Sequence, residues 1–301
     1  MQWITGIQNA ISYIEDHITE PIDYEELGRV SFSSPFHFQR VFSILCGYTV
    51  GEYIRNRRLS LAGTELAAGR GKVIDVAAKY GYDSPDAFAR AFQKFHGLSP
   101  SQARGNGAKL KAFSRLSIKI TLEGGTTMNY RIEEKQELKL VGYKRRFTGT
   151  PMDRNYQDHN FTCETRLNQA VLHWMAHDCD TSYNVFSNFG DDGYDFTIAG
   201  WLNGEGVANI AEDMGEEIAA RFEEVMVPAG LYLVCETPRC KWPCDNLEEL
   251  YRRAVTELLP AADYELTEGP EVEVVHWFYR PGDEELNSSR YVELWLPVRK
   301  H

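Results

Sequence analysis

The chain has 301 residues, of which 43% are hydrophobic, and it carries a formal net charge of −12. This hydrophobic content excludes a disordered chain and is sufficient for two ordinary domains. The sequence contains no apolar run near the roughly 20 residues of a membrane-spanning helix. Residues 1–20 lack the basic start and apolar stretch of a secretory signal. We therefore expect a cytoplasmic protein with no membrane partner.

The charge is unevenly divided along the sequence. Residues 1–119 contain 15 Lys and Arg and 11 Asp and Glu, whereas residues 120–301 contain 17 and 33. A mildly basic segment followed by a strongly acidic one indicates two domains with different functions. The acidic part would also weaken nonspecific adsorption to DNA. We predict a first domain over 1–108, a connector over 109–127, in which 117–122 alternate like a strand, and a second domain over 128–301.

The six cysteines have no paired spacing typical of a disulfide framework. Cys235, Cys240 and Cys244 are close in sequence, but they lack a fourth ligand and the Cys-x-x-Cys turn of a structural zinc site. His173 and His177 lie four residues apart without the accompanying Glu of a metalloprotease helix. The sequence thus predicts free thiols, no metal site and no cofactor.

A repeat with an offset of 50 residues is the strongest signal in the first segment. The pattern Ser-Pro-x-x-Phe-x-Arg-x-Phe begins at Ser34 and again at Ser84, and Gly47 and Gly97 follow at matching positions. A serine before a proline marks a helix start, and glycine suits the left-handed residue that ends a helix. Each copy therefore predicts a helix whose phenylalanines share one apolar face.

A shorter helix is expected before each copy, over 24–30 and over 73–80. Two short helices joined by a tight turn form a helix-turn-helix unit, whose second helix can enter the major groove of DNA. Small residues, Gly28 and Ala78, stand where the paired helices would cross closely.

A long amphipathic helix is predicted between the two units, over 50–68. At about 1.5 Å per residue it spans nearly 30 Å, close to the roughly 34 Å between successive major-groove faces. A monomer could thus present both recognition helices to one side of DNA, and a homodimer is the alternative. Arg55, Arg57 and Arg58 on this helix either meet phosphate or form a solvated face.

These motifs resemble the AraC/XylS family of transcription regulators over roughly residues 5–105. The second unit carries the closest match, with Gly81-Tyr82-x-Ser84 followed by Phe88-x-Arg90-x-Phe92-x2-Phe95-x-Gly97-x-Ser99-Pro100. One departure is Phe32, in the first turn, where many members have glycine. The resemblance implies double-stranded promoter DNA as a partner, and RNA polymerase is a further candidate. It implies a DNA-facing surface that contains Phe36, Gln39, Arg40, Ala87 and Arg90.

The acidic segment predicts two rounds of strands and helices. The first round is strand, helix, strand and strand at 139–147, 167–177, 182–186 and 194–201. The second repeats this order at 225–237, 246–258, 272–279 and 291–297. A twofold β-α-β-β order predicts an α+β domain with pseudo-twofold symmetry. The predicted fold is therefore multidomain: an all-α tandem helix-turn-helix domain followed by an α+β domain with two β-α-β-β repeats around an antiparallel sheet.

The last predicted strand indicates a ligand site. Tyr291, Glu293 and Trp295 alternate onto one face of it. A carboxylate between two aromatic rings can hold a cation through its charge and through the ring quadrupoles. The alternative is a solvated Glu whose aromatic neighbours pack elsewhere. Further walls of such a pocket could come from Trp201, Tyr232, Trp277 and Tyr279.

Residues from about 128 to 300 resemble the GyrI-like effector-binding domain of AraC-type regulators and multidrug-sensing proteins. The closing segment, Tyr291-Val292-Glu293-Leu294-Trp295-Leu296-Pro297-Val298, carries much of this likeness. The resemblance implies that Glu293 lies at the base of an aromatic pocket for a lipophilic or cationic small molecule.

The leading hypothesis is a DNA-binding regulator, not an enzyme, whose promoter binding changes when a small-molecule effector binds. Such a change requires that the effector bind two states of the protein with different affinity. Two alternatives stay open: a small-molecule hydrolase that uses Glu293 as a general base, and a regulator without a ligand.

Overall fold

The structure is a computed structural model that describes residues 2–105, 107–118, 128–152 and 157–300. It comprises two compact units, one of residues 1–39 and 50–123 and the other of residues 40–49 and 124–301. The strand expected at 117–122 falls mainly outside the described residues. Among the described helices, none is both long and apolar enough to cross a membrane.

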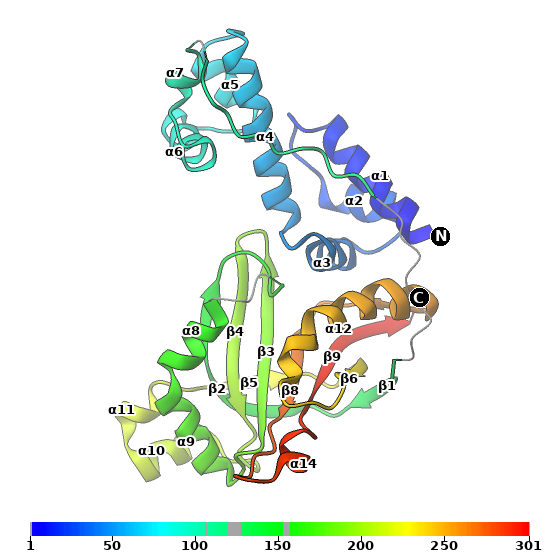
Figure 1. Cartoon of the computed structure of the whole chain (residues 1–301), viewed down its shortest axis with the longest axis vertical. Helices are drawn as coiled ribbons and strands as arrows, with labels where there is room; N and C mark the ends of the chain where they lie inside the picture. Colours follow the sequence, from blue (N-terminus) through cyan, green and yellow to red (C-terminus); the bar gives the residue numbers. More distant parts are fainter. Residues whose placement is uncertain (1, 106, 119–127, 153–156, 301) are drawn as a thin grey trace. The chain divides into compact units, whose positions relative to one another are not determined.

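The first hundred residues are helical, as predicted (Figure 1). The pairs α2–α3 and α5–α6 are the two predicted helix-turn-helix units, and α4 is the predicted linking helix. The helices described in this part are α1 (Gln2–Asp16), α2 (Tyr24–Ser31), α3 (Pro35–Cys46), α4 (Val50–Ala67), α5 (Val73–Lys79), α6 (Pro85–His96) and α7 (Pro100–Ala103).

The starts and ends of α3 and α6 follow from their caps. The Ser34 hydroxyl accepts a hydrogen bond from the backbone N–H three residues on (3.2 Å), and Ser84 does the same (3.4 Å). These bonds satisfy donors that a helix start otherwise leaves unpaired. Gly47 and Gly97 adopt the left-handed conformation with φ of 75° and 82°. The repeat therefore predicted both helices correctly.

The turns of the two units reach the same backbone region with different residues. Gly81 has φ of 79° in the second turn, and Phe32 has φ of 57° in the first. The positive φ favours glycine at position 81, and a Cβ atom there would also lie 2.7 Å from an Arg58 guanidinium nitrogen, which would have to move. Phe32 is 62% exposed and bears the cost of the left-handed region, about 1–2 kcal/mol for an L-residue.

The connector after α7 is held against the helices by its backbone. Three of its N–H groups donate to side chains of α4 and α6, in the pairs Lys111–His96 (3.2 Å), Phe113–Ser60 (3.0 Å) and Leu116–Tyr53 (3.3 Å). Beneath it, α4, α5 and α6 share a buried core that includes Leu59, Leu66, Val76, Phe88 and Phe92.

The second unit is built on an antiparallel sheet (Figure 1). The strand order along it is β1-β6-β9-β8-β3-β4-β2-β5, and β7 pairs separately with β9. The strands are β1 (Tyr130–Lys135), β2 (Leu138–Phe147), β3 (Thr181–Gly190), β4 (Gly193–Gly200), β5 (Glu223–Val227), β6 (Gly230–Glu236), β7 (Tyr264–Leu266), β8 (Glu271–His276) and β9 (Tyr291–Lys300).

The predicted double β-α-β-β order is confirmed. The first round is β2, α8 (Gln157–Glu164) with α9 (Arg166–Ala176), β3 and β4. The second is β6, α12 (Leu247–Arg253), β8 and β9. The remaining helical segments are α10 (Val207–Met214), α11 (Glu216–Ala219), η1 (Pro243–Asn246), η2 (Ala254–Leu258), α13 (Leu259–Ala261) and α14 (Glu284–Asn287).

One predicted strand was wrong. The stretch 225–237 is not one strand but parts of two, β5 and β6, because the chain turns at Pro228 and Ala229. The two edge strands are also exchanged between the halves of the sheet. β1 precedes β2 in the chain but pairs with β6, whereas β5 precedes β6 but pairs with β2.

The sheet has an apolar core on each face. Helices α8 and α9 cover the side of β2, β3 and β4 (Figure 1), where the buried residues include Phe161, Leu172, Phe186 and Phe196. The residues that alternate with these along the strands form a second cluster on the other face. It includes Leu140, Val185, Val234, Val272 and Trp295. Side chains that are adjacent in a strand therefore point to opposite faces of the sheet and pack in different apolar clusters.

Candidate DNA interface and effector site

Helix α6 presents a polar surface of the kind a recognition helix needs. Phe88 and Phe92 are fully buried on its inner side, whereas Arg90 is exposed. Ala87 is partly exposed, and its N–H is bonded to the Ser84 cap. Further exposed polar residues on the helix are Asp86, Gln93 and Lys94. A base edge or a phosphate can therefore reach the guanidinium group of Arg90.

Helix α3 places its three predicted residues differently. Phe36 and Gln39 are partly buried, and the Gln39 amide donates to the Pro35 carbonyl (3.2 Å). Arg40 belongs, with Glu271 of β8, to the second unit. There its guanidinium donates two hydrogen bonds of 2.5 Å to the Glu271 carboxylate. Because only 3% of Arg40 is exposed, this side chain is not available to DNA in the structure, unlike Arg90.

The arginines of α4 have mostly structural contacts. Arg57 binds the Glu15 carboxylate (2.7 Å) and the Phe113 carbonyl (2.5 Å), which joins α1 and the connector to α4. Arg58 donates to the Ile18 carbonyl (2.7 Å). Arg55 is exposed and remains the one of the three predicted arginines that is open to phosphate.

The pKa of Glu15 reflects this arrangement. Burial alone would raise it, but hydrogen bonds from Arg57 and Tyr53 outweigh burial and hold the pKa below its ordinary value. The carboxylate is therefore charged at neutral pH, and the pair with Arg57 stays intact.

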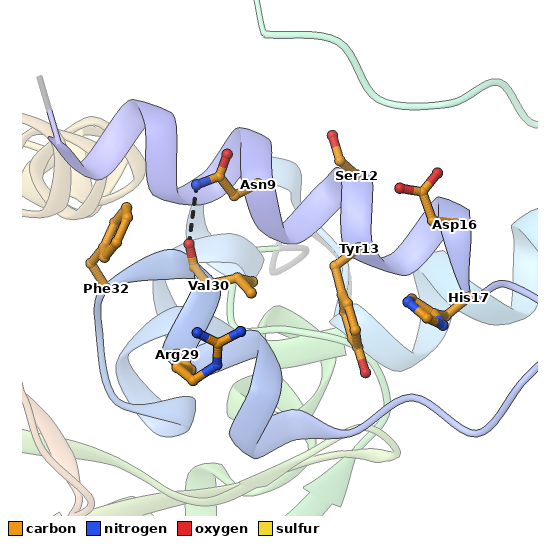
Figure 2. Close-up of a pocket in the computed structure, with 8 residues that line it drawn as sticks. All are labelled: Asn9, Ser12, Tyr13, Asp16, His17, Arg29, Val30 and Phe32. Atoms are coloured by element: carbon orange, nitrogen blue, oxygen red, sulfur yellow. Dashed lines mark hydrogen bonds between the residues drawn. The ribbon is translucent and has the colours of Figure 1, made fainter.

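An open hollow of about 420 Å³ lies along α1 and α2 (Figure 2). Figure 2 shows Asn9 donating to the Val30 carbonyl at one end (3.3 Å) and Tyr13 nearer the other. Phe32, the left-handed residue of the first turn, also lines it. The lining residues come from α1, α2 and that turn. The hollow is therefore not part of the recognition-helix surface.

A cavity of about 410 Å³ lies in the second unit, on the face of the sheet that bears α9. It is lined by α9, by β3, β4 and β8 with the loops beside them, and by η1. Its apolar wall includes Leu172, Ile198, Val275 and Trp277. Its polar wall includes Gln169, His173, Asp178, Asp180 and Asn184.

The acidic part of this wall is rigidly held. One Asp178 carboxylate oxygen accepts the backbone N–H groups of Asp180 (2.7 Å) and Thr181 (3.2 Å). The Asp180 carbonyl accepts the backbone N–H of Trp277 (2.6 Å), which joins the backbone of the acidic loop to that of the tryptophan. These bonds place negative charge next to an aromatic surface.

The polar wall extends into the protein through Asn184. Its amide donates to a carboxylate oxygen of Glu273 (3.2 Å), and Glu273 is fully buried. The cavity thus combines apolar walls, hydrogen-bonding amide and imidazole groups, and two aspartates. This chemistry suits a small molecule with an apolar body and a positive or hydrogen-donating group.

The six residues predicted to bind a ligand do not gather at one place. Trp277 alone among them lines the cavity. Tyr291, Glu293 and Trp295 share the opposite face of the sheet, where Trp295 belongs to the second apolar cluster. Tyr232 is buried on that same face, where its ring lies 6.4 Å from the Trp295 ring and its hydroxyl donates to the Pro228 carbonyl (2.9 Å). Trp201 lies apart, exposed beyond the end of β4.

Sequence reasoning missed the cavity's acidic loop. Asp178 and Asp180 flank Cys179 between α9 and β3, and this Asp-x-Asp pattern at a helix–strand junction was the available signal. Gln169 and His173, four residues apart, form the polar stripe of α9 that faces the cavity. Neither pattern is specific without knowledge of which strands lie beside it.

The cysteine thiols and the possible metal ligands are the other candidates for reactive groups. The structure gives all six cysteines as thiols rather than disulfides. Burial raises the pKa of Cys46 and of Cys235 to about 12, so neither is a ready nucleophile. Within the described residues, no group of three His, Cys, Asp or Glu side chains is arranged to hold a metal ion.

Comparisons with known proteins divide the chain in the same way as the sequence. A family model described as a helix-turn-helix domain matches residues 27–106. A model described as integron-associated effector binding protein matches residues 131–298.

Individual relatives match one part or the other. The HTH-type transcriptional regulator YbfP of Bacillus subtilis is 38% identical over 104 residues, which are 35% of each chain. The regulatory protein SoxS of Salmonella typhimurium is 37% identical over 98 residues, or 33% of this chain and 92% of SoxS. A transcription regulation protein from Staphylococcus aureus MU50 has 17% identity and a TM-score of 0.41, over 57% of this chain and 99% of that structure. The chain thus spans about a third of YbfP's length.

Proposed function

The chain belongs to the family of integron-associated effector binding proteins and carries an AraC-type helix-turn-helix domain in front of that region, and we propose that it is a transcription regulator controlled by a small molecule. The observation that carries this proposal is the coexistence of an exposed recognition helix, α6, with a cavity of ligand size in the second unit. The first supplies DNA contact and the second supplies a place for an effector.

Promoter DNA is the first proposed partner. Helix α4 has 18 residues, about 27 Å at 1.5 Å per residue, which suits two recognition helices on successive major grooves. One chain per operator site is therefore expected, and sedimentation of the DNA complex would measure this stoichiometry. RNA polymerase is a further proposed partner, tested by transcription from the bound promoter with purified polymerase.

The proposed effector is a lipophilic organic cation. The cavity volume falls within the range of small-molecule sites, about 300–1,000 Å³. Asp178 and Asp180 supply negative charge, and Trp277 supplies an aromatic surface of the kind that attracts cations, beside which the Arg290 guanidinium carbon already lies 4.4 Å from the ring centre. An anionic ligand would instead meet two carboxylates, so the cavity discriminates by charge as well as by size.

Tetraphenylphosphonium, a bulky cation without hydrogen-bond donors, is a suitable probe for calorimetric titration. Asp180→Asn should weaken its binding by about 1–2 kcal/mol, roughly 5- to 30-fold, because one of two adjacent charges is lost. Trp277→Ala should weaken it as well. Glu217→Gln is the matched control, because it removes one negative charge from an exposed site on α11 away from the cavity lining.

The titration also separates the alternatives. If a panel of lipophilic cations shows no binding, or if Asp180→Asn and Glu217→Gln have equal effects, the cavity is not the effector site. A regulator without a ligand would show promoter binding that no member of the panel changes.

A further inference from the structure

Two of the six cysteines line the cavity of the second unit. Cys179 comes from the loop between α9 and β3, and Cys244 comes from η1. These two cysteines are exposed, whereas the other four are partly or fully buried. The most accessible thiols of the chain therefore border the proposed effector cavity.

The backbone on both sides of Cys179 is fixed. One Asp178 carboxylate oxygen accepts the N–H groups of Asp180 and Thr181, and the Asp180 carbonyl accepts the backbone N–H of Trp277. Cys179 thus has an aspartate on each side in the sequence, and both aspartates line the cavity with it. Negative charge beside a thiol attracts a positively charged reagent and repels an anionic one.

Cys244 is held at the cavity by a different part of the fold. Arg290, directly before β9, is only 3% exposed and anchors the segment that leads to Cys244. Its carbonyl accepts the Cys240 N–H (3.0 Å), and its guanidinium donates to the Lys241 carbonyl (3.1 Å). The two thiols therefore reach one cavity from segments that are far apart in sequence and are anchored independently.

The walls of the cavity suit an organic molecule that reacts with sulfur. Leu172, Ile198 and Val275 offer apolar contact to the body of such a molecule. His173, on the polar wall, carries a ring N–H in either neutral tautomer. An alkene conjugated to a carbonyl group needs a thiol for its carbon and a hydrogen-bond donor for its oxygen, and the cavity lining contains both.

We propose that the cavity captures α,β-unsaturated carbonyl compounds covalently, with Cys179 as the nucleophile for cationic members of this class and Cys244 as a second acceptor. This inference rests on the proposed effector cavity and names a reactive ligand class for it. The thiol first releases its proton to water. The thiolate then forms a C–S bond to the β-carbon, while the alkene π electrons move to the α-carbon, which takes up a proton from water. The addition consumes no oxidant or reductant.

A covalent effector regulates for longer than a reversible one. The adduct stays in the cavity when the free compound is diluted, whereas a noncovalent ligand such as tetraphenylphosphonium dissociates. Promoter binding therefore stays altered after exposure to the reactive compound has ended.

Labelling kinetics on the whole protein test the capture step. Two maleimides of the same size, one with a trimethylammonium group and one with a sulfonate, are compared by peptide mass spectrometry of each cysteine. The rate at Cys179 should saturate with the concentration of the cationic reagent, because binding in the cavity precedes bond formation. After normalisation to 2-mercaptoethanol, the cationic reagent should react roughly tenfold faster than the anionic one. Asp180→Asn should reduce this preference, and Glu217→Gln, an exposed charge on α11, should not.

Promoter binding after removal of free reagent tests the regulatory step. The labelled wild type should keep the change in promoter affinity that tetraphenylphosphonium produces reversibly. Cys179→Ser combined with Cys244→Ser should not respond to the maleimide. Cys240→Ser is the matched thiol control, because Cys240 lies four positions before Cys244 but outside the described lining of the cavity. It should respond as the wild type does.

Two results would overturn the proposal. The first is a labelling rate at Cys179 that increases linearly with concentration and shows the charge preference of 2-mercaptoethanol, since a thiol that is merely exposed behaves in this way. The second is an adduct at Cys179 that leaves promoter affinity unchanged. If tetraphenylphosphonium binds the unlabelled protein in either case, the effector cavity stands and only covalent capture fails. If labelling saturates although tetraphenylphosphonium does not bind, capture stands and the organic-cation effector fails.

Discussion

Helix α6 and strand β9 were both predicted from the sequence as binding elements, and they differ in what the fold leaves available. On α6, Arg90 is exposed beside further exposed polar residues. On β9, Glu293 is bonded to Arg131 and Trp295 lies under Lys135. The local structure of both elements follows their residue pattern, but only the helix keeps its predicted functional side chain open.

The two elements differ because the residues that surround a side chain are close in sequence on a helix and can be distant in sequence in a sheet. An exposed residue of an isolated helix face has neighbours three and four positions away, which the sequence displays. A residue on a strand has neighbours on the adjoining strands, which can be far away in sequence. Arg131 is 162 positions from Glu293 and reaches it through the exchange of β1 to the edge of the other half.

The largest effect on function is expected from Arg90. Arg90→Ala should weaken specific promoter binding by about 1–3 kcal/mol, roughly 5- to 150-fold, if the guanidinium reads a base edge. If it contacts phosphate, the loss should be similar for all sequences and the salt dependence should decrease by about one charge. Titration of labelled promoter DNA at several salt concentrations separates the two cases.

Lys94→Ala is the control, because it removes an exposed positive charge from the same helix. Its expected effect is smaller and independent of sequence. Specific binding that is equally strong in Arg90→Ala and the wild type would remove α6 from the DNA interface, and the contrast with β9 would then fail.

A smaller effect, a gain in stability, is expected from a substitution in the turn of the first helix-turn-helix unit. Phe32→Gly should raise the free energy of unfolding by about 0.5–1 kcal/mol, because glycine accepts positive φ without the cost that Phe bears. Gly81→Ala should destabilise the second turn, where the new Cβ would meet Arg58. Denaturant unfolding of both variants measures the two changes in the free energy of unfolding. No gain from Phe32→Gly would mean that the Phe32 ring contributes more packing in the hollow than its exposure indicates.

Local signals accounted for most of the helical unit and for the strand order of the other. The caps at Ser34 and Ser84 and the glycines that end both helices are encoded within a few residues, so those helices were predicted to within about a residue. The β5–β6 boundary was lost because Pro228 and Ala229 stand inside a continuous apolar run. In that run, the periodicity alone does not reveal the turn.

The binding sites were harder to predict because they depend on distant pairings. The cavity joins Asp178, Asp180 and Trp277, which are brought together by the pairing of β3 with β8. The burial of Arg40 depends on Glu271, 231 positions away, although the repeat places Arg40 and Arg90 at equivalent positions. Sequence periodicity assigns a face to each residue but does not say which distant charge will meet it.

A lesser effect on stability is expected from Glu293→Gln. Arg131 is substantially exposed and keeps two other carboxylates, so the loss should be under about 1 kcal/mol. Promoter affinity and tetraphenylphosphonium affinity of the cavity should stay at wild-type levels. A strong loss of cation binding in this single variant would instead identify the β9 face, not the cavity, as the effector site.

The smallest expected effect is on the pH dependence of stability. It compares His96, at the end of α6, with His276 on β8, the strand beside β9. His96 ends α6 and is buried, its Nδ1 accepts the Lys111 N–H (3.2 Å), and its Nε2 lies 3.0 Å from the Leu59 carbonyl. A ring nitrogen that accepts an N–H is not protonated, so the bound ring is neutral with its proton on Nε2. Burial lowers the pKa of His96, a shift that the Leu59 carbonyl opposes in part.

The sign of the pH dependence follows from this shift. The unfolded chain takes up a proton near pH 6.5, whereas the folded chain does so only at lower pH. The contribution of His96 to stability is therefore complete above about pH 6.5 and declines as the pH falls toward the folded pKa. His96→Gln should flatten this decline in unfolding curves measured between pH 5 and 8.

Burial likewise lowers the pKa of His276, on β8 beside β9, but here the charges of Glu293, Glu236 and Asp178 oppose the shift and that of Arg239 adds to it. The same decline below pH 6.5 is expected. Unlike that of His96, it should become steeper with added salt, because the partly exposed carboxylates oppose the shift and salt screens them. If salt changes the pH dependence of stability equally for His96 and His276, then charges distant in sequence do not affect the strand histidine more than the helix histidine.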